Sequence, residues 1–253
     1  MESGSGTEIA RAAARRPPPP RRAGGGRATA AGTIYAELRD ELVSLARRPG
    51  DPIVEKQIAA AYGVSRTPVR EAVLRLADEG LIDIFPQSGT FVSRIPTAAL
   101  PEAMVIRRSL EETTARLAAE RASRAQIAVI EAILKRQREV SALADQHAFH
   151  LADEAFHAAI AEAAGLPRVW TLVQQVKVQV DRVRRLTLPQ KGRMPLLIKE
   201  HAAIAAAIRK HDPAEAAAYM GAHLDRLLRE LEGLHHLNPD FFVPGQPSAR
   251  AAE

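Results

Sequence analysis

The sequence predicts a mainly α-helical protein of two domains, and three observations lead to this fold class. Alanine is abundant and aromatic residues form only 4% of the chain, which favours close-packed helices over a β-sandwich. Apolar residues recur at helical spacing through most of the 253 residues. The composition changes at Pro96 and Pro101, so residues 33–95 and 100–237 are predicted to fold as separate domains.

Three helices and a hairpin are predicted in the first domain. Apolar side chains at helical spacing indicate helices over 33–48 and 54–62. A third helix starts near Ser65 and ends at Gly80. Its predicted buried stripe consists of four apolar residues, Val69, Ala72, Val73 and Leu76. Two β-prone runs then surround residues 86–89, and the whole order of elements predicts a winged helix-turn-helix.

The exposed face of the third helix carries two arginines one turn apart, Arg66 and Arg70. An arginine fork can bind guanine O6 and N7 with two hydrogen bonds, at about 1–3 kcal/mol of base discrimination for each good pair. Ser65 and Thr67 stand at the helix start, where free N–H groups suit a phosphate. The alternative is that the arginines only solvate the helix face. Their place on a third helix, between a turn and a hairpin, favours DNA contact.

Residues 33–95 resemble the N-terminal DNA-binding domain of GntR-family bacterial transcription regulators. The resemblance covers IAAAYGVSRTPVREAVLRLADEGLI and the glycine-containing wing PQSGTFV. It implies that the second helix, the third helix and the wing tip contact operator DNA, with the wing approaching the minor groove. The implied contacts are Lys56, Ser65, Arg66, Thr67, Arg70, Gln87 and Gly89. We expect Arg75 either to pair with Asp78 or Glu79 or to reach a phosphate.

Residues 100–237 are predicted to form an all-α bundle of about six helices without a strand. Two tails flank the predicted domains. Residues 1–32 are rich in arginine, proline and glycine and are predicted to be a disordered basic tail. Residues 238–253 are interrupted by prolines and are predicted to be loose, with Phe241 and Phe242 as candidates for docking.

Three histidines of the second domain, His157, His201 and His223, lie on otherwise apolar helix stripes and should point inward. Asp153 precedes His157 by four residues and shares its helix face. Any one buried histidine is more often a satisfied core residue than a ligand. Four unpaired polar groups in one core would be costly, and a single divalent cation would satisfy them all. We expect zinc first, with nickel, manganese or iron as alternatives.

The second domain resembles the FCD ligand-binding domain of FadR-type regulators. The similarity lies in RRSLEETTARLAAERAS, DEAFHAAIAEAAGLPR, EHAAIAAAI and AHLDRLL. It implies that the metal ligands are the four residues named above. It also implies that Arg107 faces an effector cavity, although Glu111 is an equally reachable partner. A small carboxylate effector bound at open metal positions would then pair with Arg107.

Charge and cysteine content limit the functional classes. The net charge is +5, but six arginines against two glutamates place +4 of it in residues 1–32, so the DNA prediction rests on where the charges lie. The chain has no cysteine, which excludes disulfides and thiolate metal sites and favours the cytoplasm. No apolar run reaches the length of a membrane span.

These features together predict a homodimeric, DNA-binding transcription regulator, a repressor by first expectation, rather than an enzyme. Two third helices would enter successive major grooves of a near-palindromic operator. A metalloenzyme is the first alternative, but the one neighbouring candidate base, Glu154, projects about 100° away from Asp153 around the helix. A regulator with a purely structural metal is the second alternative.

Overall fold

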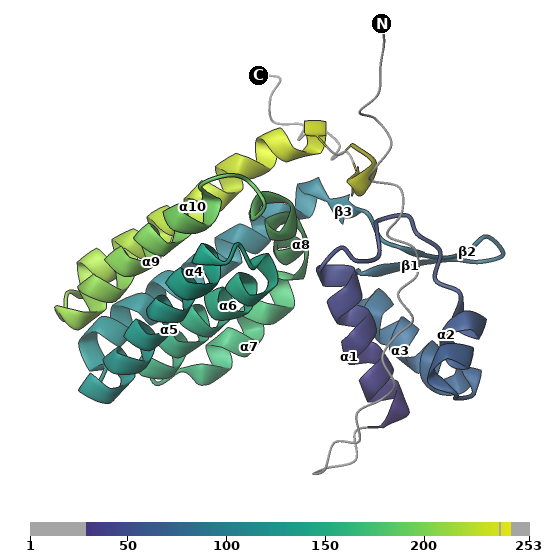
Figure 1. Ribbon diagram of the computed structural model, residues 1–253, viewed down its shortest axis with the longest axis horizontal. Coiled ribbons are helices and arrows are strands. Elements are labelled where there is room, and N and C mark those ends of the chain that lie inside the picture. Colours follow the sequence, from purple (N-terminus) through teal and green to yellow (C-terminus); the bar gives the residue numbers. More distant parts are fainter. Residues whose placement is uncertain (1–28, 238, 244–253) are drawn as a thin grey trace, which may run out of the picture.

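The computed structural model describes residues 29–237 and 239–243 and shows a small N-terminal body beside a larger bundle of helices (Figure 1). The predicted disordered tail falls almost wholly on residues 1–28, which lie outside the described residues, as does the end of the chain from 244 to 253. Within the described ranges, every helix is too short or too polar to cross a lipid bilayer.

The N-terminal body contains three helices and a hairpin, as predicted. Its elements are α1 (Ala30–Val43), α2 (Glu55–Tyr62), α3 (Arg66–Asp78), β1 (Ile82–Phe85) and β2 (Gly89–Val92). The first helix is displaced from its predicted range of 33–48. It begins earlier because the Thr29 side chain accepts a hydrogen bond from the Gly32 N–H at 3.1 Å. It ends earlier because Leu45 adopts a left-handed φ of 62°.

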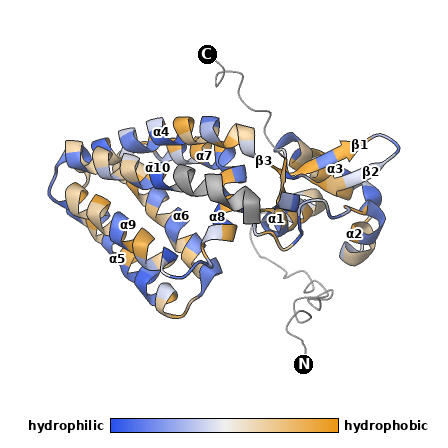
Figure 2. Cartoon of the chain, turned by 90° about the horizontal axis from the view of Figure 1, so that it is seen from above, coloured by the Kyte–Doolittle hydropathy of each residue, from blue (hydrophilic) through white to orange (hydrophobic). Residues whose placement is uncertain are grey.

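The predicted buried stripe of α3 is confirmed, because all four of its residues are almost fully buried. They pack with apolar side chains of α1, α2 and the hairpin into one core. Figure 2 shows that helices throughout the molecule carry hydrophobic residues along one side and hydrophilic residues along the other. The side of α3 opposite its stripe therefore remains in solvent.

The hairpin forms a wing whose tip depends on one glycine. β1 and β2 pair antiparallel, with Ile82 opposite Val92 and Phe85 opposite Gly89. Gly89 has a φ of 120°, and a Cβ at this position would lie 3.2 Å from the Phe91 ring. Any side chain at position 89 would therefore be both strained and crowded.

The C-terminal body contains seven described helices rather than about six. They are α4 (Leu100–Arg121), α5 (Arg124–Ala142), α6 (Gln146–Ala163), α7 (Pro167–Val176), α8 (Val178–Thr187), α9 (Arg193–Arg209) and α10 (Pro213–Leu237). The additional helix arises because the backbone leaves helical geometry at Lys177, with φ −91° and ψ 1°. This break separates α7 from α8 without a glycine or proline to signal it.

The prediction of a loose C-terminal tail is wrong for residues 239–243. β4 (Phe242–Val243) pairs in parallel with β3 (Ile95–Pro96), the segment that enters the helical bundle. Phe242 is buried within the core of that bundle. The burial of this aromatic ring provides the hydrophobic stabilisation that holds the segment in place.

Candidate metal centre and nucleic-acid interface

The start of α3 exposes the side chains that the sequence predicts to contact DNA. Ser65 is the N-cap residue, and its side chain makes no capping hydrogen bond. Arg66, Thr67 and Arg70 are exposed on the first turns of the helix, while Lys56 is exposed on the neighbouring helix α2. Backbone N–H groups at this helix start are oriented to bind a phosphate.

The two arginines of α3 differ in their surroundings. Arg66 pairs with Glu55 of α2 at 3.1 Å, and the two line a shallow hollow of about 500 Å³. Arg70 lines the same hollow, but the structure gives it no hydrogen bond or ion pair to another described residue. The guanidinium of Arg70 is therefore available to an incoming ligand. Arg66 must first release the Glu55 carboxylate before it can bind that ligand.

Arg75 does not form the predicted ion pair with Asp78 or Glu79, and its phosphate contact stays a prediction. Its guanidinium carbon lies 3.9 Å from the centre of the Tyr35 ring, in a cation–π contact. Glu79, its expected partner, binds the Tyr35 hydroxyl and Arg39 instead. This arrangement joins α3 to α1.

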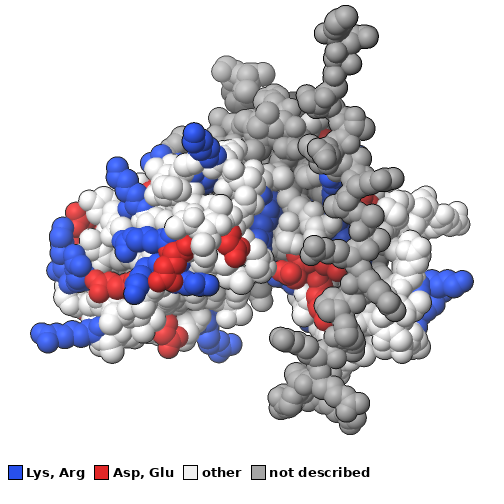
Figure 3. Space-filling model, in the orientation of Figure 1, with Lys and Arg blue, Asp and Glu red and all other residues white. Residues whose placement is uncertain are grey.

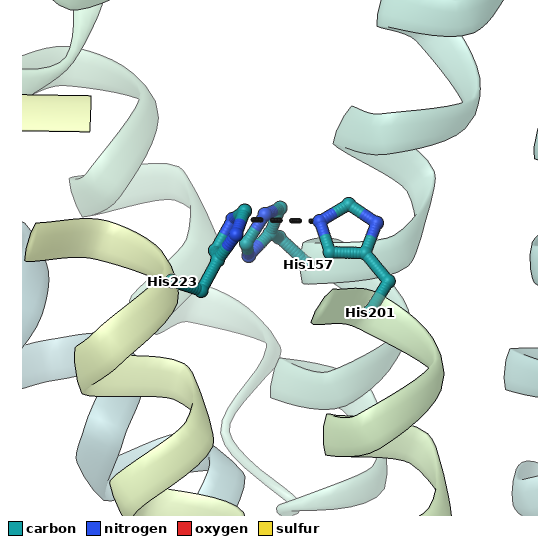
Figure 4. A group of neighbouring side chains, drawn as sticks. All are labelled: His157, His201 and His223. Carbon is teal, nitrogen blue, oxygen red and sulfur yellow. Dashed lines mark hydrogen bonds between the residues drawn. The ribbon is translucent and has the colours of Figure 1, made fainter. Parts of the chain in front are cut away.

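Three buried histidines converge from three helices in the C-terminal body (Figure 4). They are His157 of α6, His201 of α9 and His223 of α10, and one ring nitrogen from each lies within 4.8 Å of the others. The Nε2 atoms of His201 and His223 are 3.4 Å apart. Asp153 completes the group, with carboxylate oxygens 3.6 Å from His201 Nε2 and 3.9 Å from His157 Nε2.

Each histidine ring is oriented by an acceptor at its other nitrogen. His201 Nδ1 lies 2.9 Å from the Gln137 amide oxygen, and His223 Nδ1 lies 2.8 Å from Glu200. His157 Nδ1 faces Glu111. An N–H on each Nδ1 leaves the Nε2 lone pair free, and this is the arrangement that metal-binding histidines show.

The surroundings of these side chains shift their pKa values towards the protonation states that bind a cation. Burial lowers the pKa of His201 and of His223 well below the ordinary histidine value, and neighbouring cations lower both further. Burial alone would raise the pKa of Asp153, but the Arg184 guanidinium beside it holds that pKa far below its usual range. His201 and His223 are therefore neutral and Asp153 is ionised at neutral pH.

These residues fit a divalent transition metal. Two nitrogens bound to one tetrahedral zinc at about 2.0–2.1 Å lie about 3.3–3.4 Å apart, close to the separation of the His201 and His223 Nε2 atoms. One oxygen of Asp153, Oδ2, is buried without a hydrogen-bond partner among the described residues. Three imidazole nitrogens and one carboxylate oxygen suit zinc, nickel, manganese or iron.

The N-terminal and C-terminal bodies each match a known protein-family model. The profile described as "Bacterial regulatory proteins, gntR family" matches residues 30–92, and that of the "FCD domain" matches residues 102–226. The HTH-type transcriptional repressor RspR of Escherichia coli K12 is 32% identical over 209 residues, which cover 83% of this chain and 92% of the relative.

The chain belongs to the GntR family. It is a DNA-binding transcription regulator with an FCD domain. The Nta operon transcriptional regulator of Aminobacter aminovorans is 31% identical, over 76% of this chain and 91% of that protein. The structure of E. coli McbR/YncC shares the fold at a TM-score of 0.71 and 20% identity, over 83% of this chain and 100% of that one.

Sequence reasoning missed several residues of this candidate metal centre. Gln137, Arg184 and Glu200 approach it from α5, α8 and α9. Gln137 and Arg184 have no short spacing to the histidines, whereas Glu200 directly precedes His201, and this adjacency was the one available signal. Arg107 pairs with Glu111, the alternative partner named above, and also lies 3.5 Å from His157 Nε2. Its place in an effector cavity stays a prediction.

One aromatic ring covers the centre. Trp170 of α7 stacks on His157, with ring centres 5.9 Å apart and planes inclined by 7°. The Lys177 ammonium lies 5.4 Å from the same indole. The ring therefore separates the histidines from the ion pairs at the α7–α8 break.

A second cluster beside the centre resembles a metal site but already contains a cation. His150, Glu154 and Asp181 place possible ligand atoms within 4.8 Å of one another. The Lys177 ammonium lies 2.8 Å from Glu154 and 2.5 Å from Asp181. This ammonium supplies the positive charge that the two carboxylates need. It also occupies the one carboxylate, Glu154, that a metalloenzyme reading of the sequence would use as a base.

Proposed function

We propose that this regulator is a homodimeric repressor whose affinity for operator DNA is controlled by a small carboxylate effector at a metal in the helical domain. The convergence of three buried histidines and the ionised Asp153 on one point carries the proposal. The names of relatives support repression: RspR is a transcriptional repressor, and a D-xylose utilization operon repressor of Paenarthrobacter nicotinovorans is 35% identical over 54% of this chain. A cytoplasmic location follows from action on operator DNA.

The DNA-binding step is assigned to the exposed start of α3 and its neighbours. Arg66 and Arg70 enter the major groove, the helix start binds a phosphate, and Lys56 neutralises another. Gln87 and Gly89 bring the wing to the minor groove. Figure 3 shows acidic and basic side chains interspersed on one face of the molecule rather than gathered in one field, so these local contacts have to position the protein on DNA.

The effector-binding step is assigned to the metal centre and two buried arginines. The metal, when bound by Asp153 and the three histidines, supplies positive charge and coordination positions for a carboxylate. The Nη1 groups of Arg107 and Arg184 are buried and have no hydrogen-bond partner among the described residues. An effector carboxylate would accept charge-assisted hydrogen bonds from these groups.

The first experiment is metal analysis of the protein purified without a histidine tag, repeated on His201→Ala. We expect about one equivalent of transition metal in the native chain and a loss of that metal in the variant. Arg209→Ala, an exposed change on the same helix, is the matched control and should keep its metal. An absence of metal from the native protein, even after incubation with zinc, would contradict the proposed site.

Operator titration in the presence of small carboxylates then tests control by an effector. Effector binding must favour one arrangement of the dimer, so operator affinity should change by the ratio of the effector's affinities for the two arrangements. An unchanged affinity across a broad panel of acids would leave a purely structural metal as the better description. In that case metal removal would lower the melting temperature without any effector response.

A further inference from the structure

Among the described side chains of the C-terminal bundle, only one on α8 forms part of the N-terminal core. Figure 1 shows α8 at the junction of the two bodies, beside α1. Val178, its first residue, is buried and packs within the hydrophobic core of the N-terminal body. The two domains therefore share a core at this helix rather than meeting only through a linker.

Two polar side chains of α8 add directed contacts to the N-terminal body. The Gln179 amide donates a hydrogen bond to the Gly80 carbonyl at 2.8 Å, and Arg182 donates one to the Ser93 carbonyl at 2.6 Å. Arg182 also bonds Gln179 at 2.9 Å, which joins the two contacts. Gly80 and Ser93 bracket the hairpin, so α8 holds both ends of the wing.

Arg182 is fully buried, yet its partners are a carbonyl and an amide rather than a carboxylate. A buried cation without a directly paired anion is costly. The hydrogen bonds of Arg182 must therefore have good geometry for the contact between α8 and the N-terminal body to be stable. The interface between α8 and the N-terminal body therefore depends on a few hydrogen bonds whose strength is sensitive to geometry. A displacement of α8 that lengthens them would weaken it steeply.

The other side of α8 contacts the metal centre. Arg184 follows Arg182 by two residues, which places it about 200° around the helix. It is buried and binds the Asp153 carboxylate. At the start of the helix, Lys177 anchors the break from α7 to Glu154, the neighbour of Asp153. One short helix thus contacts the metal centre on one side and the wing on the other.

We propose that α8 is a latch that couples the metal centre to the position of the DNA-binding domain. This inference rests on the proposed function, since it names the route by which that site would control DNA binding. A ligand that competes for Asp153 or for Arg184 changes the buried ion pair that joins α8 directly to Asp153. Because α8 moves as a rigid rod of about 15 Å, the Gln179 and Arg182 contacts follow it.

Hydrogen exchange of the full chain, without metal, effector or DNA, tests the latch. Arg184→Met changes only the metal-centre side of α8, yet we expect at least tenfold faster amide exchange in residues 81–93 across the interface. Gln179→Ala, at a half-exposed position, should give the same loosening from the other side. Arg107→Met is the matched control, because Arg107 is equally buried at the centre but belongs to α4.

The outcomes separate the latch from general loosening. Unchanged exchange in residues 81–93 of Arg184→Met, or equal loosening in Arg107→Met, would overturn the proposal. Arg184→Lys, which keeps the charge, replaces Arg184→Met if that variant does not fold, with the same expected direction. Zinc binding is measured separately, on the native chain and on Gln179→Ala. If the native chain does not bind zinc, the metal proposal is refuted. The exchange comparison, which is made without metal, still decides whether α8 is a latch.

Discussion

The candidate DNA-reading face at the start of α3 and the candidate metal centre each contain an arginine beside a glutamate, exposed in the first and buried in the second. The Arg66 side chain, paired with Glu55, is 69% exposed, whereas Arg107, paired with Glu111, is 1% exposed. An exposed pair contributes about 0–1 kcal/mol, while breaking a buried pair costs about 3–5 kcal/mol. The exposed arginine can therefore change partner when DNA arrives. The buried arginines stay in place, and only a ligand that brings its own charge can displace them.

Removal of a buried cation should have the largest effect. Arg184→Met leaves the Asp153 carboxylate buried without its partner, so we expect the free energy of unfolding to fall by about 3–5 kcal/mol in the metal-free protein. Bound zinc should restore part of this loss, because the carboxylate then pairs with the metal. Urea unfolding with and without zinc measures both effects. Arg66→Met is the exposed control. An equal loss of unfolding free energy in both variants would show that burial does not distinguish the two ion pairs.

The next effect distinguishes a buried from an exposed histidine on the same helix. Burial lowers the pKa of His150 to about 4, while His147 is exposed. Below pH 6.5 the unfolded chain protonates this histidine but the folded chain does not, so stability falls as the pH falls from 6.5 towards 4. From pH 6.5 to pH 5 this single group should cost about 2 kcal/mol.

His150→Gln should flatten this part of the stability profile, and His147→Gln should leave it unchanged. Unfolding curves between pH 5 and pH 7 provide the measurement. A native profile that keeps its slope in His150→Gln would show that His150 is protonated in the folded chain as well.

Two exposed cations of the DNA-reading face should differ from each other. Arg70→Ala should lose about 1–3 kcal/mol of binding on the operator and little on unrelated DNA, because we propose that its guanidinium binds a base edge. Lys56→Ala should weaken binding to every sequence and reduce the slope of affinity against salt by about one. Titration of both DNAs at several salt concentrations separates the two roles, and identical behaviour of the variants would refute the division.

The smallest expected effect concerns the acid on the DNA-reading face. Glu55→Gln releases Arg66 and removes one negative charge near the phosphates. We expect tighter binding to unrelated DNA and a loss of less than about 1 kcal/mol in the preference for the operator. Glu71→Gln, which lines the same hollow, is the control for charge alone. An unchanged preference in Glu55→Gln would show that the pair does not orient Arg66.

The sequence predicted those parts of the molecule that depend on spacing along one helix. The stripe from Val69 to Leu76 and the inward histidines both follow from helical periodicity. Contacts between helices were not predictable in this way. Arg184 lies 31 residues from Asp153, and Gln137 lies 64 residues from His201, so only the packing of the bundle brings them together. The break at Lys177 was missed because no glycine or proline stands there, and the ion pairs of Lys177 with Glu154 and Asp181 form only in the folded bundle.

The indole that stacks on His157 has a consequence for observing this regulator in solution. Trp170 is the single tryptophan of the 253 residues, so all emission excited at the red edge of the protein absorption originates beside the metal centre. A paramagnetic ion such as nickel at that centre would quench this emission, whereas zinc would alter only its wavelength and intensity. Trp170 fluorescence can therefore report metal binding at the candidate centre in the native chain, without an added label.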